Sequence, residues 1–263
     1  MTYQDPNPPT LSPTRPFCME AVIVCDQYAD FLVQTLPHNK FLFDRIVVVT
    51  SYEDKATQRV CEFHHVECIR TDELQSRKGQ FHKGKGINAG LKALSLRGWA
   101  VHLDADIYLP PQTRLLLQAA DLDPAFIYGI DRFNVRGFDA WAAFQGLPRL
   151  QHENETYIHL GAFPMGTRVM HRHAGGYVPI GFFQLWNAGR FPHRRYPLQQ
   201  GSAEHTDVLH AIQWPAGNRR VIPEIIAVHL ESERCAMGTN WNGRRTREFG
   251  KRASQVGQNA VGY

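Results

Sequence analysis

Residues 99–111 read Trp-Ala-Val-His-Leu-Asp-Ala-Asp-Ile-Tyr-Leu-Pro-Pro, an apolar run that ends in the two carboxylates of Asp104 and Asp106. The apolar residues predict a buried strand, and side chains two positions apart on a strand point to the same side. Two carboxylates at the end of a buried strand are costly unless a positive group lies next to them. A divalent cation such as Mg²⁺ or Mn²⁺, which prefers oxygen ligands, meets that need. We therefore predict that Asp104 and Asp106 hold a metal ion.

Similar β-branched runs occur on both sides of this stretch and alternate with helix-length segments. The predicted strands cover residues 21–25, 46–50, 66–69, 100–103 and 126–130. The predicted helices cover residues 29–36, 53–63 and 86–96. This alternation indicates βαβ units, and therefore an α/β fold with a mainly parallel central sheet flanked by helices. In such a sheet ligands bind at the carboxyl ends of the strands, which is where Asp104 and Asp106 lie.

The chain of 263 residues is predicted to fold as a single domain from residue 18 to residue 252. Residues 1–17 read as a flexible Pro-rich leader, and residues 253–263 as a flexible tail. Between residues 137 and 195 the alternation is lost and Gly, Pro, His and aromatic residues accumulate, so we expect an irregular region that serves recognition. A further helix at residues 206–213 and a strand at residues 225–228 are predicted to follow.

No apolar run approaches the roughly 20 residues that span a bilayer, and the N-terminal residues have no apolar signal core. We therefore expect a cytoplasmic protein without membrane insertion. The five cysteines include no C-x-x-C pair, which argues against a disulfide framework and a structural zinc site. Cys25 is interpreted as a small buried residue rather than a nucleophile. The sequence leaves the oligomeric state open.

The net charge of +4 is concentrated in the last quarter of the chain. From Arg190 to Arg252 there are 11 basic and six acidic residues, whereas residues 1–189 hold 18 basic and 19 acidic ones. A basic tail of this kind suits an anionic ligand, either nucleotide phosphates or a nucleic-acid backbone, and equally a solvated basic face.

A second chemical motif lies just upstream of the paired carboxylates. Residues 81–91 read Phe-His-Lys-Gly-Lys-Gly-Ile-Asn-Ala-Gly-Leu, so glycines and lysines open a predicted helix. Backbone N–H groups and ammonium groups at such a position can approach a phosphate. The motif lacks the G-K-[ST] of a Walker loop and is not a dinucleotide fingerprint.

The two motifs together, Lys-Gly-Lys-Gly-Ile-Asn-Ala-Gly-Leu at 83–91 and Leu-Asp-Ala-Asp at 103–106, resemble those of the GT-A glycosyltransferases, particularly the inverting family 2. The resemblance covers about residues 20–130. It implies a GT-A (Rossmann-like) fold in which residues 18–130 bind a nucleotide-diphosphate sugar, most often UDP-linked, and residues 131–252 bind the acceptor. It also implies a Mn²⁺ or Mg²⁺ cofactor, with Asp106 as the principal ligand and Asp104 on the ribose or the metal. The other donor-binding residues that it implies are Cys25, Asp26, Tyr28, Thr50, Ser51, Glu53, Lys83 and Asn88.

The resemblance also implies a later acidic residue that takes the proton from the acceptor hydroxyl. The family usually shows an E-D or D-D pair opening a helix, and residues 203–209 here read Ala-Glu-His-Thr-Asp-Val-Leu. Because the second acid of the pair is replaced by His205, the identity of the base stays open. Asp207 at the start of the predicted helix is favoured, followed by Glu204 and then His205.

Two further features lie near the C-terminus. The strand Ile-Ile-Ala-Val-His-Leu at 225–230 ends in His229, and several GT-A enzymes use a late histidine as a metal ligand, while an imidazole there is as often structural. Residues 238–245 read Gly-Thr-Asn-Trp-Asn-Gly-Arg-Arg and could fold over the donor. We expect Trp241 to pack on the sugar or base and Arg244 to contact the diphosphate.

The main hypothesis is thus a metal-dependent glycosyltransferase, inverting by preference, whose acceptor is a saccharide or glycan precursor or a hydroxymethylated base in DNA. One alternative is a sugar-phosphate nucleotidyltransferase, which usually carries a G-x-G-T-R-like loop where this chain has Cys25-Asp26-Gln27-Tyr28. Another is a non-catalytic nucleic-acid-binding domain that uses the basic tail, which leaves the paired carboxylates unexplained.

Overall fold

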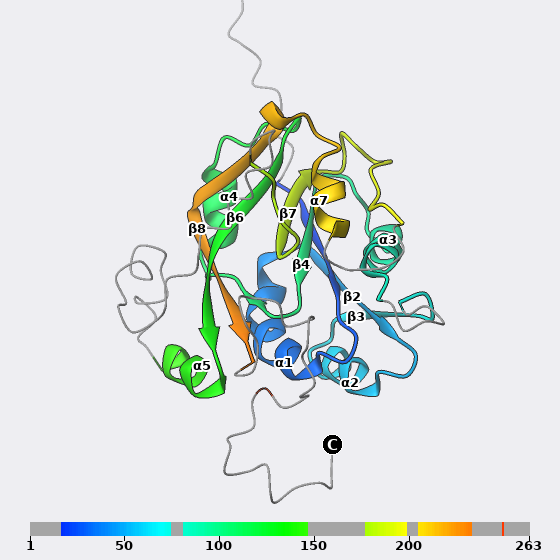
Figure 1. The fold of residues 1–263 in the computed structure, drawn as a ribbon, viewed down its shortest axis with the longest axis vertical. Helices are drawn as coiled ribbons and strands as arrows, with labels where there is room; N and C mark the ends of the chain where they lie inside the picture. The colour runs from blue at the N-terminus through cyan, green and yellow to red at the C-terminus, as the bar shows by residue number, and fades with distance from the viewer. Residues whose placement is uncertain (1–16, 75–80, 147–176, 199–204, 233–248, 250–263) are drawn as a thin grey trace, which may run out of the picture.

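The computed structural model describes residues 17–74, 81–146, 177–198, 205–232 and 249 (Figure 1). The predicted tail and all but the last residue of the predicted leader lie outside these ranges. The described strands form one eight-stranded sheet with the order β3-β2-β1-β4-β7-β6-β8-β5. In chain order they are β1 Met19–Val24, β2 Arg45–Ser51, β3 Glu67–Thr71, β4 Trp99–Asp104, β5 Ile107–Tyr108, β6 Ile127–Arg136, β7 Phe183–Asn187 and β8 Arg219–Glu231.

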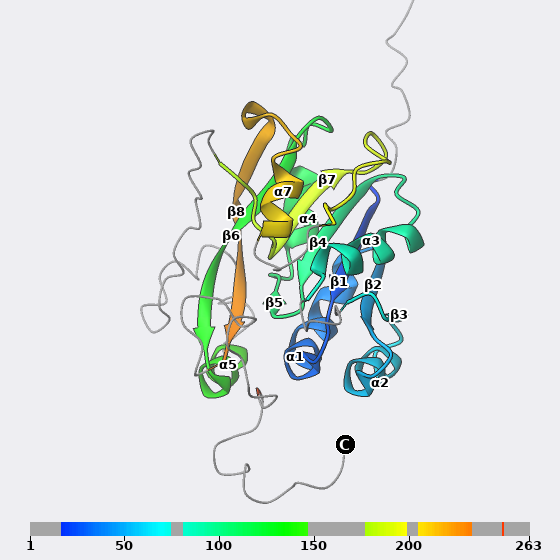
Figure 2. The same ribbon diagram turned by 45° about the vertical axis from the view of Figure 1, so that its right-hand side comes forward.

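Helices cover both faces of this sheet (Figures 1 and 2). The α-helices are α1 Ala29–Asn39, α2 Lys55–Phe63, α3 Lys83–Ala93, α4 Thr113–Ala119, α5 Phe138–Gln145 and α7 Thr206–Ala211. Two short 3₁₀ helices, η1 Lys40–Leu42 and η4 Ala216–Asn218, complete the set. None of the helices in the described ranges is long and apolar enough to cross a membrane.

The sheet confirms the predicted α/β class. Strands β3, β2, β1 and β4 are all parallel, as are β6 and β8, while β7 runs antiparallel between β4 and β6. Short antiparallel β5 pairs with β8 at the other edge. The carboxyl ends of β1, β2 and β4 therefore meet at one edge of the sheet, where an open α/β sheet binds its ligands.

Several predicted elements have different bounds in the structure. The helix expected from residue 86 begins at Lys83, and the strands expected at 126–130 and 225–228 run over Ile127–Arg136 and Arg219–Glu231. Strand β7 lies in the segment that was predicted to be irregular. Its first four residues are all buried because the strand is flanked on both sides and covered on both faces, so it shows no polar alternation.

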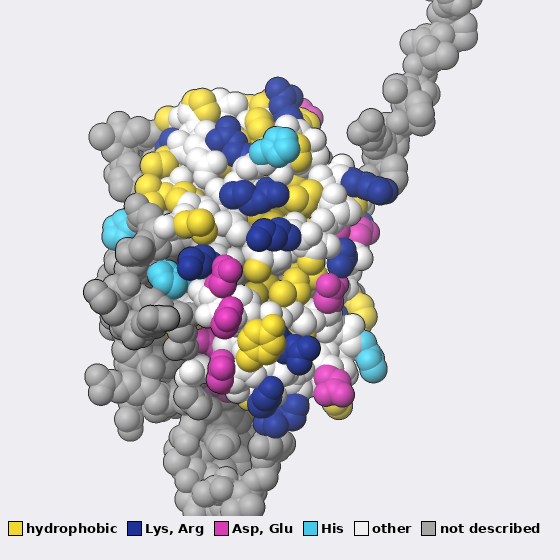
Figure 3. All heavy atoms as spheres, turned by 90° about the vertical axis from the view of Figure 1, so that its right-hand side faces the viewer, with side chains coloured by type: hydrophobic (Ala, Val, Ile, Leu, Met, Phe, Trp, Pro, Cys, Tyr) yellow, Lys and Arg dark blue, Asp and Glu magenta, His cyan; other side chains and the backbone are white. Residues whose placement is uncertain are grey.

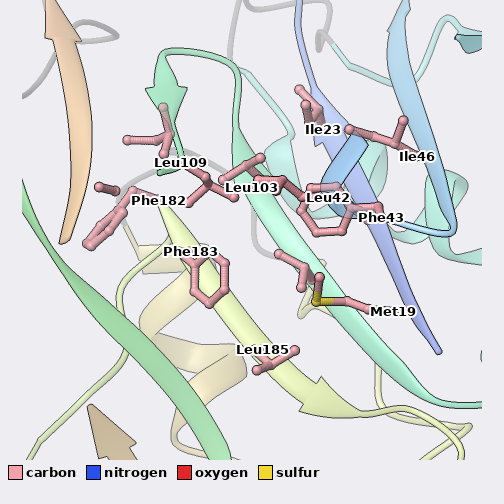
Figure 4. Packing of buried hydrophobic residues seen from close by; sticks show 14 of the residues in the cluster. Met19, Ile23, Leu42, Phe43, Ile46, Leu103, Leu109, Phe182, Phe183 and Leu185 are labelled. Carbon is pink, nitrogen blue, oxygen red and sulfur yellow. The ribbon is translucent and has the colours of Figure 1, made fainter. Parts of the chain in front are cut away.

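Alternating side chains of the parallel strands divide the core into two layers. On β1, Ala21 and Ile23 pack on the side of α1, while Val22 and Val24 pack on the side of α3. Figure 4 shows the first layer, in which residues of β1, β2, β4 and β7 interlock with Leu42 and Phe43. On the second side, α3 approaches β1 and β2 very closely at Gly90, where a Cβ would lie 2.2 Å from Val22 Cγ2. The close packing of α3 fixes the position of its first residue, Lys83.

Candidate active site

Hydrogen-bonded polar side chains join the carboxyl ends of β1 and β2. Ser51 Oγ donates to Asp26 Oδ1 at 2.6 Å. Asp54 caps α2 by accepting from Thr57 N at 3.0 Å, and its other oxygen accepts from the backbone N of Gln27 at 2.6 Å. Gln27 itself has a positive φ of 61°, so the chain turns sharply after β1. These contacts build a rigid polar rim at the edge where the donor nucleotide was predicted to bind.

The residues predicted to line that nucleotide pocket differ in their exposure. Glu53 is exposed and Tyr28 is half-buried, so both can reach a ligand. The side chain of Thr50 is fully buried and its hydroxyl donates to Asp54. Cys25 is 1% exposed and its Sγ lies 3.3 Å from Thr57 Oγ1, so its thiol belongs to the core, as the interpretation of a small buried cysteine expects. The predicted place of Cys25 at the nucleotide pocket therefore rests on its backbone and stays a prediction.

An ion pair ties the Lys-Gly motif to the first carboxylate of the D-x-D stretch. Lys83 Nζ, on the first residue of α3, lies 2.6 Å from Asp104 Oδ1, on the last residue of β4. His102 Nε2, which is fully buried, lies 3.4 Å from the same oxygen. Burial pushes the pKa of Lys83 down, but the negative charges of Asp104 and Asp207 outweigh this effect and raise the pKa. Burial would raise the pKa of Asp104, yet Lys83 and His102 hold it well below its usual value.

Asn88 has a different role from the predicted one. Its Nδ2 donates to the backbone O of Tyr196 at 2.8 Å, and its Oδ1 accepts from the backbone N of Tyr196 at 2.9 Å. Both ends of the amide are thus engaged with one residue of the segment between β7 and α7. The Tyr196 ring is buried and stacks on His210 with centroids 3.8 Å apart. Asn88 therefore anchors this segment to α3 and does not point its amide at a nucleotide.

Asp106 lies next to His229. Its side chain is placed by a turn after β4 and not by the strand alternation that was predicted to align it with Asp104. Strand β4 ends at Asp104 and the chain turns at residues 105–106, so strand alternation does not extend to Asp106. Its Oδ2 lies 3.3 Å from His229 Nε2 in β8, and both side chains are almost completely buried. The backbone fixes this contact, because Ile107 pairs with His229 and Leu230 N donates to Asp106 O at 2.9 Å. Carboxylate and imidazole together are a ligand pair for a divalent cation.

Residues of β6 that were not predicted as site residues extend the site. In the β6–β8 register Arg132 is opposite Ala227, Asn134 opposite His229, and Arg136 opposite Glu231. Because strand side chains alternate, these residues share one face, while those between them, including Phe133 and Val228, pack in the core. The alternation Arg-Phe-Asn-Val-Arg at 132–136 was the signal for this face, but the predicted strand stopped at residue 130.

Arg132 is the less exposed of the two arginines on this face. Its guanidinium lies over the Phe182 ring, 4.7 Å from the centroid. Burial lowers the pKa of Arg132, whereas the negative charges of Asp106 and Asp104 act in the opposite direction. Since Lys83 also interacts with both of these carboxylates, the site contains two cations and two acids within electrostatic range of one another.

Asp207 is the candidate base that the structure brings into the site. Its Oδ2 accepts a short hydrogen bond from the backbone N of Gly181, just before β7. A Cβ on Gly181 would lie 2.4 Å from that oxygen, so only glycine allows this approach. Asp207 interacts electrostatically with Lys83 and Arg132, which places it near the D-x-D residues. His205 is exposed beside it, while Glu204, Trp241 and Arg244 lie outside the described residues.

Across the described ranges, no group of three or more His, Cys, Asp and Glu side chains is arranged to hold a metal ion alone. The pair Asp106 and His229 therefore supplies two ligands at most, and any further ones must come from elsewhere. A site of this kind, with open positions, suits a cation that is shared with a phosphate-bearing substrate. The residues present thus fit a Mg²⁺ or Mn²⁺ ion bound together with a diphosphate.

The parallel strands β3-β2-β1-β4, the antiparallel β7 and the D-x-D turn after β4 define the GT-A fold, which is the fold of nucleotide-sugar-dependent glycosyltransferases. No protein-family profile and no curated protein sequence matches the chain. Among solved structures it is similar to mannosyl-3-phosphoglycerate synthase from Rubrobacter xylanophilus, with a TM-score of 0.50 and 17% identity over 84% of this chain and 68% of that one.

Two further solved structures are similar, with lower scores. One is glucosyl-3-phosphoglycerate synthase from Mycobacterium tuberculosis in complex with Mn²⁺, UDP and phosphoglyceric acid, with a TM-score of 0.46, 10% identity and coverage of 81% and 71%. The other is a mycobacterial protein with a TM-score of 0.44, 13% identity and coverage of 82% and 66%. The chain thus spans about two thirds of the length of these proteins. At 17% identity and a TM-score of 0.50, the likeness to the Rubrobacter xylanophilus enzyme establishes the fold and nothing finer.

Proposed function

We propose that this protein transfers a sugar from a nucleotide-diphosphate donor, with UDP as the nucleotide, to the hydroxyl group of an acceptor. The observation that carries the proposal is the contact between Asp106 Oδ2 and His229 Nε2 at 3.3 Å, at the carboxyl edge of the sheet. It joins the D-x-D turn to a strand far away in the sequence and creates a buried pair of oxygen and nitrogen ligands. The solved complex with Mn²⁺ and UDP named above has the same kind of fold, which agrees with a metal and a uridine nucleotide here.

Asp106 and His229 would hold the Mn²⁺ or Mg²⁺ ion. When bound, the ion neutralises charge on the diphosphate that departs from the sugar. Lys83 and Arg132 both interact electrostatically with the paired carboxylates and would add positive charge where the phosphates sit. The rim of Asp26, Ser51 and the residues after β2 would bind the nucleoside part.

Asp207 would act as the base. In the transfer, the acceptor oxygen forms a bond to the anomeric carbon, the bond from that carbon to the diphosphate oxygen breaks, and the acceptor proton passes to the carboxylate. The backbone N–H of Gly181 fixes the orientation of this carboxylate, which is the requirement for a positioned base. A direct displacement of this kind inverts the anomeric configuration.

We propose a small acceptor with an anionic group, which the guanidinium of Arg132 would bind. The support is the position of Arg132 close to both the D-x-D residues and Asp207. The name of the Rubrobacter xylanophilus enzyme, a mannosyl-3-phosphoglycerate synthase, describes an acceptor of this class.

DNA as the acceptor finds less support among the described residues. Arg194 Nη1 donates to Gln213 O at 2.8 Å, and Arg219 Nε donates to Trp214 O at 2.8 Å, so both guanidinium groups are committed to the protein. Figure 3 shows Lys and Arg side chains in the upper half of the face over α3, but acidic side chains interrupt them below. All of the basic residues after 232 lie outside the described ranges.

Thermal unfolding with UDP, GDP, CDP and ADP, each with and without Mn²⁺, tests the proposal. A ligand that binds only the folded protein stabilises it by about 2.7 kcal/mol at a concentration of 100 Kd. We expect UDP to stabilise the protein only with Mn²⁺, and the variants D106N and H229N to lose this effect. The matched controls D121N and H193N change exposed residues of the same types and should keep it. Stabilisation by UDP that needs no metal and survives D106N would overturn the proposal.

A further inference from the structure

Glu231 is a buried acid that the proposed reaction does not use. It is the last residue of β8 and is 1% exposed. Its Oε1 lies 3.8 Å from His229 Nδ1, and its Oε2 lies 3.5 Å from Arg136 Nε. Among the described residues, neither Glu231 Oε1 nor His229 Nδ1 has a hydrogen-bond partner. Two buried polar atoms that face each other across a short gap are the natural partners of one another.

The opposite nitrogen of the same ring faces Asp106. His229 Nε2 lies 3.3 Å from Asp106 Oδ2, so the imidazole stands between two carboxylates. A neutral imidazole carries its proton on one nitrogen and a lone pair on the other. If the proton is on Nδ1, it points toward Glu231, and the lone pair of Nε2 points toward Asp106 and any cation held there.

We propose that Glu231 is a positioning residue that accepts a hydrogen bond from His229 Nδ1 and thereby aims the Nε2 lone pair at the cation held with Asp106. This inference rests on the proposed metal site and adds to it the group that fixes the histidine tautomer. A carboxylate behind a metal-bound histidine orients the ring and makes the ligand nitrogen more basic. The gap of 3.8 Å is longer than a hydrogen bond, so the proposed bond requires the two side chains to move closer together.

Arg136 does not account for the burial of Glu231. The Arg136 side chain is 56% exposed and contacts only one of the two carboxylate oxygens, at a distance near the limit of an ion pair. An exposed arginine gives little compensation for an acid that is withdrawn from water. The oxygen that faces His229 is the buried one without a hydrogen-bond partner among the described residues. Glu231 also interacts electrostatically with Arg132, and the imidazole Nδ1 lies 3.8 Å from the unpartnered oxygen.

The full-length protein tests this with Mn²⁺ in the presence of UDP. Free Mn²⁺ gives a six-line electron paramagnetic resonance signal, and its loss on titration gives the Kd. We expect E231Q to raise the Kd for Mn²⁺ by about 10-fold or more, and E224Q, at an exposed position of the same strand, to leave it unchanged. In an H229A background, E231Q should add nothing, because Glu231 acts through the imidazole.

A second measurement needs no metal. Long-range ¹H–¹⁵N spectra of histidine-labelled protein should show His229 with its proton on Nδ1 in the wild type and a mixture of tautomers in E231L, whose side chain has no hydrogen-bond acceptor, with H229N assigning the signal. Wild-type protein that binds no Mn²⁺ with UDP overturns the proposed metal site. Wild-type protein that binds Mn²⁺ while E231Q binds it within about twofold, or an E231L variant that keeps the Nδ1–H tautomer, overturns this inference alone.

Discussion

Lys83→Met tests whether Lys83 and Asp104 form the central ion pair of the site. The two groups are 2.6 Å apart, and their side chains are 13% and 28% exposed. Removal of the cation leaves a largely buried carboxylate without its main partner. Such a loss costs about 3–5 kcal/mol when both groups are fully buried, and about 1.5–3 kcal/mol for a hydrogen bond to a charged group. Because water still reaches Asp104, we expect a loss of about 2 kcal/mol in the free energy of unfolding.

The effect must depend on pH in a defined direction. In the wild type the pKa of Asp104 is depressed, so its stabilising contribution is present above the unfolded pKa and is lost as the pH falls through the folded value. The pKa of Lys83 is raised, so its contribution is present below its unfolded pKa and is lost as the pH rises through the folded value. In the variant, burial of Asp104 favours its protonated form. The difference between wild type and variant should therefore be largest around neutral pH and shrink toward about pH 4.

Urea unfolding followed by circular dichroism, at about pH 7 and about pH 4, measures this difference without any ligand. Lys92→Met is the matched control, because Lys92 is an exposed residue of the same helix. It should change the free energy of unfolding by no more than about 0.5 kcal/mol at either pH. A K83M variant as stable as the wild type at neutral pH, or a difference that does not change with pH, would refute the assignment of this ion pair.

Two further substitutions test how the rest of the site is held. Gly181→Ala should push the Asp207 carboxylate out of position and lower kcat by about 10-fold or more, with UDP–Mn²⁺ stabilisation unchanged. Gly217→Ala, where a Cβ meets no atom within 4 Å, is its control, and an unchanged kcat in G181A would exclude Asp207 as the base. Asn88→Ala should lower the free energy of unfolding by about 2–3 kcal/mol, because it removes both hydrogen bonds to Tyr196. N88D keeps the acceptor and should recover part of this loss in urea unfolding. Equal stability of N88A and wild type would contradict the anchoring role.

The sequence predicted the strands that can be identified from their own residues alone. The β-branched runs of β1, β2 and β4 are buried on both faces, so they read as strands without any knowledge of their neighbours. Strand β7 could not be recognised in this way. Its sequence Phe-Gln-Leu-Trp-Asn has no alternation, and it is a strand because β4 and β6 flank it.

The candidate site was predictable where single residue types carry the chemistry. Asp104, Asp106, His229 and Asp207 were found as carboxylates and an imidazole at the ends of predicted elements, and the structure brings all four into one region. The local sequence could not show which polar atoms already have a hydrogen-bond partner within the protein. The amide of Asn88 has the chemistry of a phosphate ligand, but its partner lies 108 positions away in the chain.

Arg132 and Glu231 were missed for a related reason, since their roles depend on the pairing of β6 with β8. An isolated arginine or glutamate in a sequence reads as a solvated residue. Only the register, with Arg136 opposite Glu231 and Asn134 opposite His229, shows that these charges share a face with His229, one of the two residues proposed to hold the metal.

The pairing of β5 with β8 predicts that the region around Asp106 and His229 tolerates changes of side chain. Asp106 and His229 are brought together by backbone hydrogen bonds, since β5 pairs with β8 directly after the D-x-D turn and Leu230 N donates to Asp106 O. Substitution of either side chain leaves these bonds intact, so D106N and H229N should remove ligands without moving the turn. Lys83 and Asp104 differ, because their side chains themselves contact each other between α3 and β4. The loss of Lys83 is therefore expected to lower stability as well as binding, whereas loss of the metal-binding pair is expected to affect binding first.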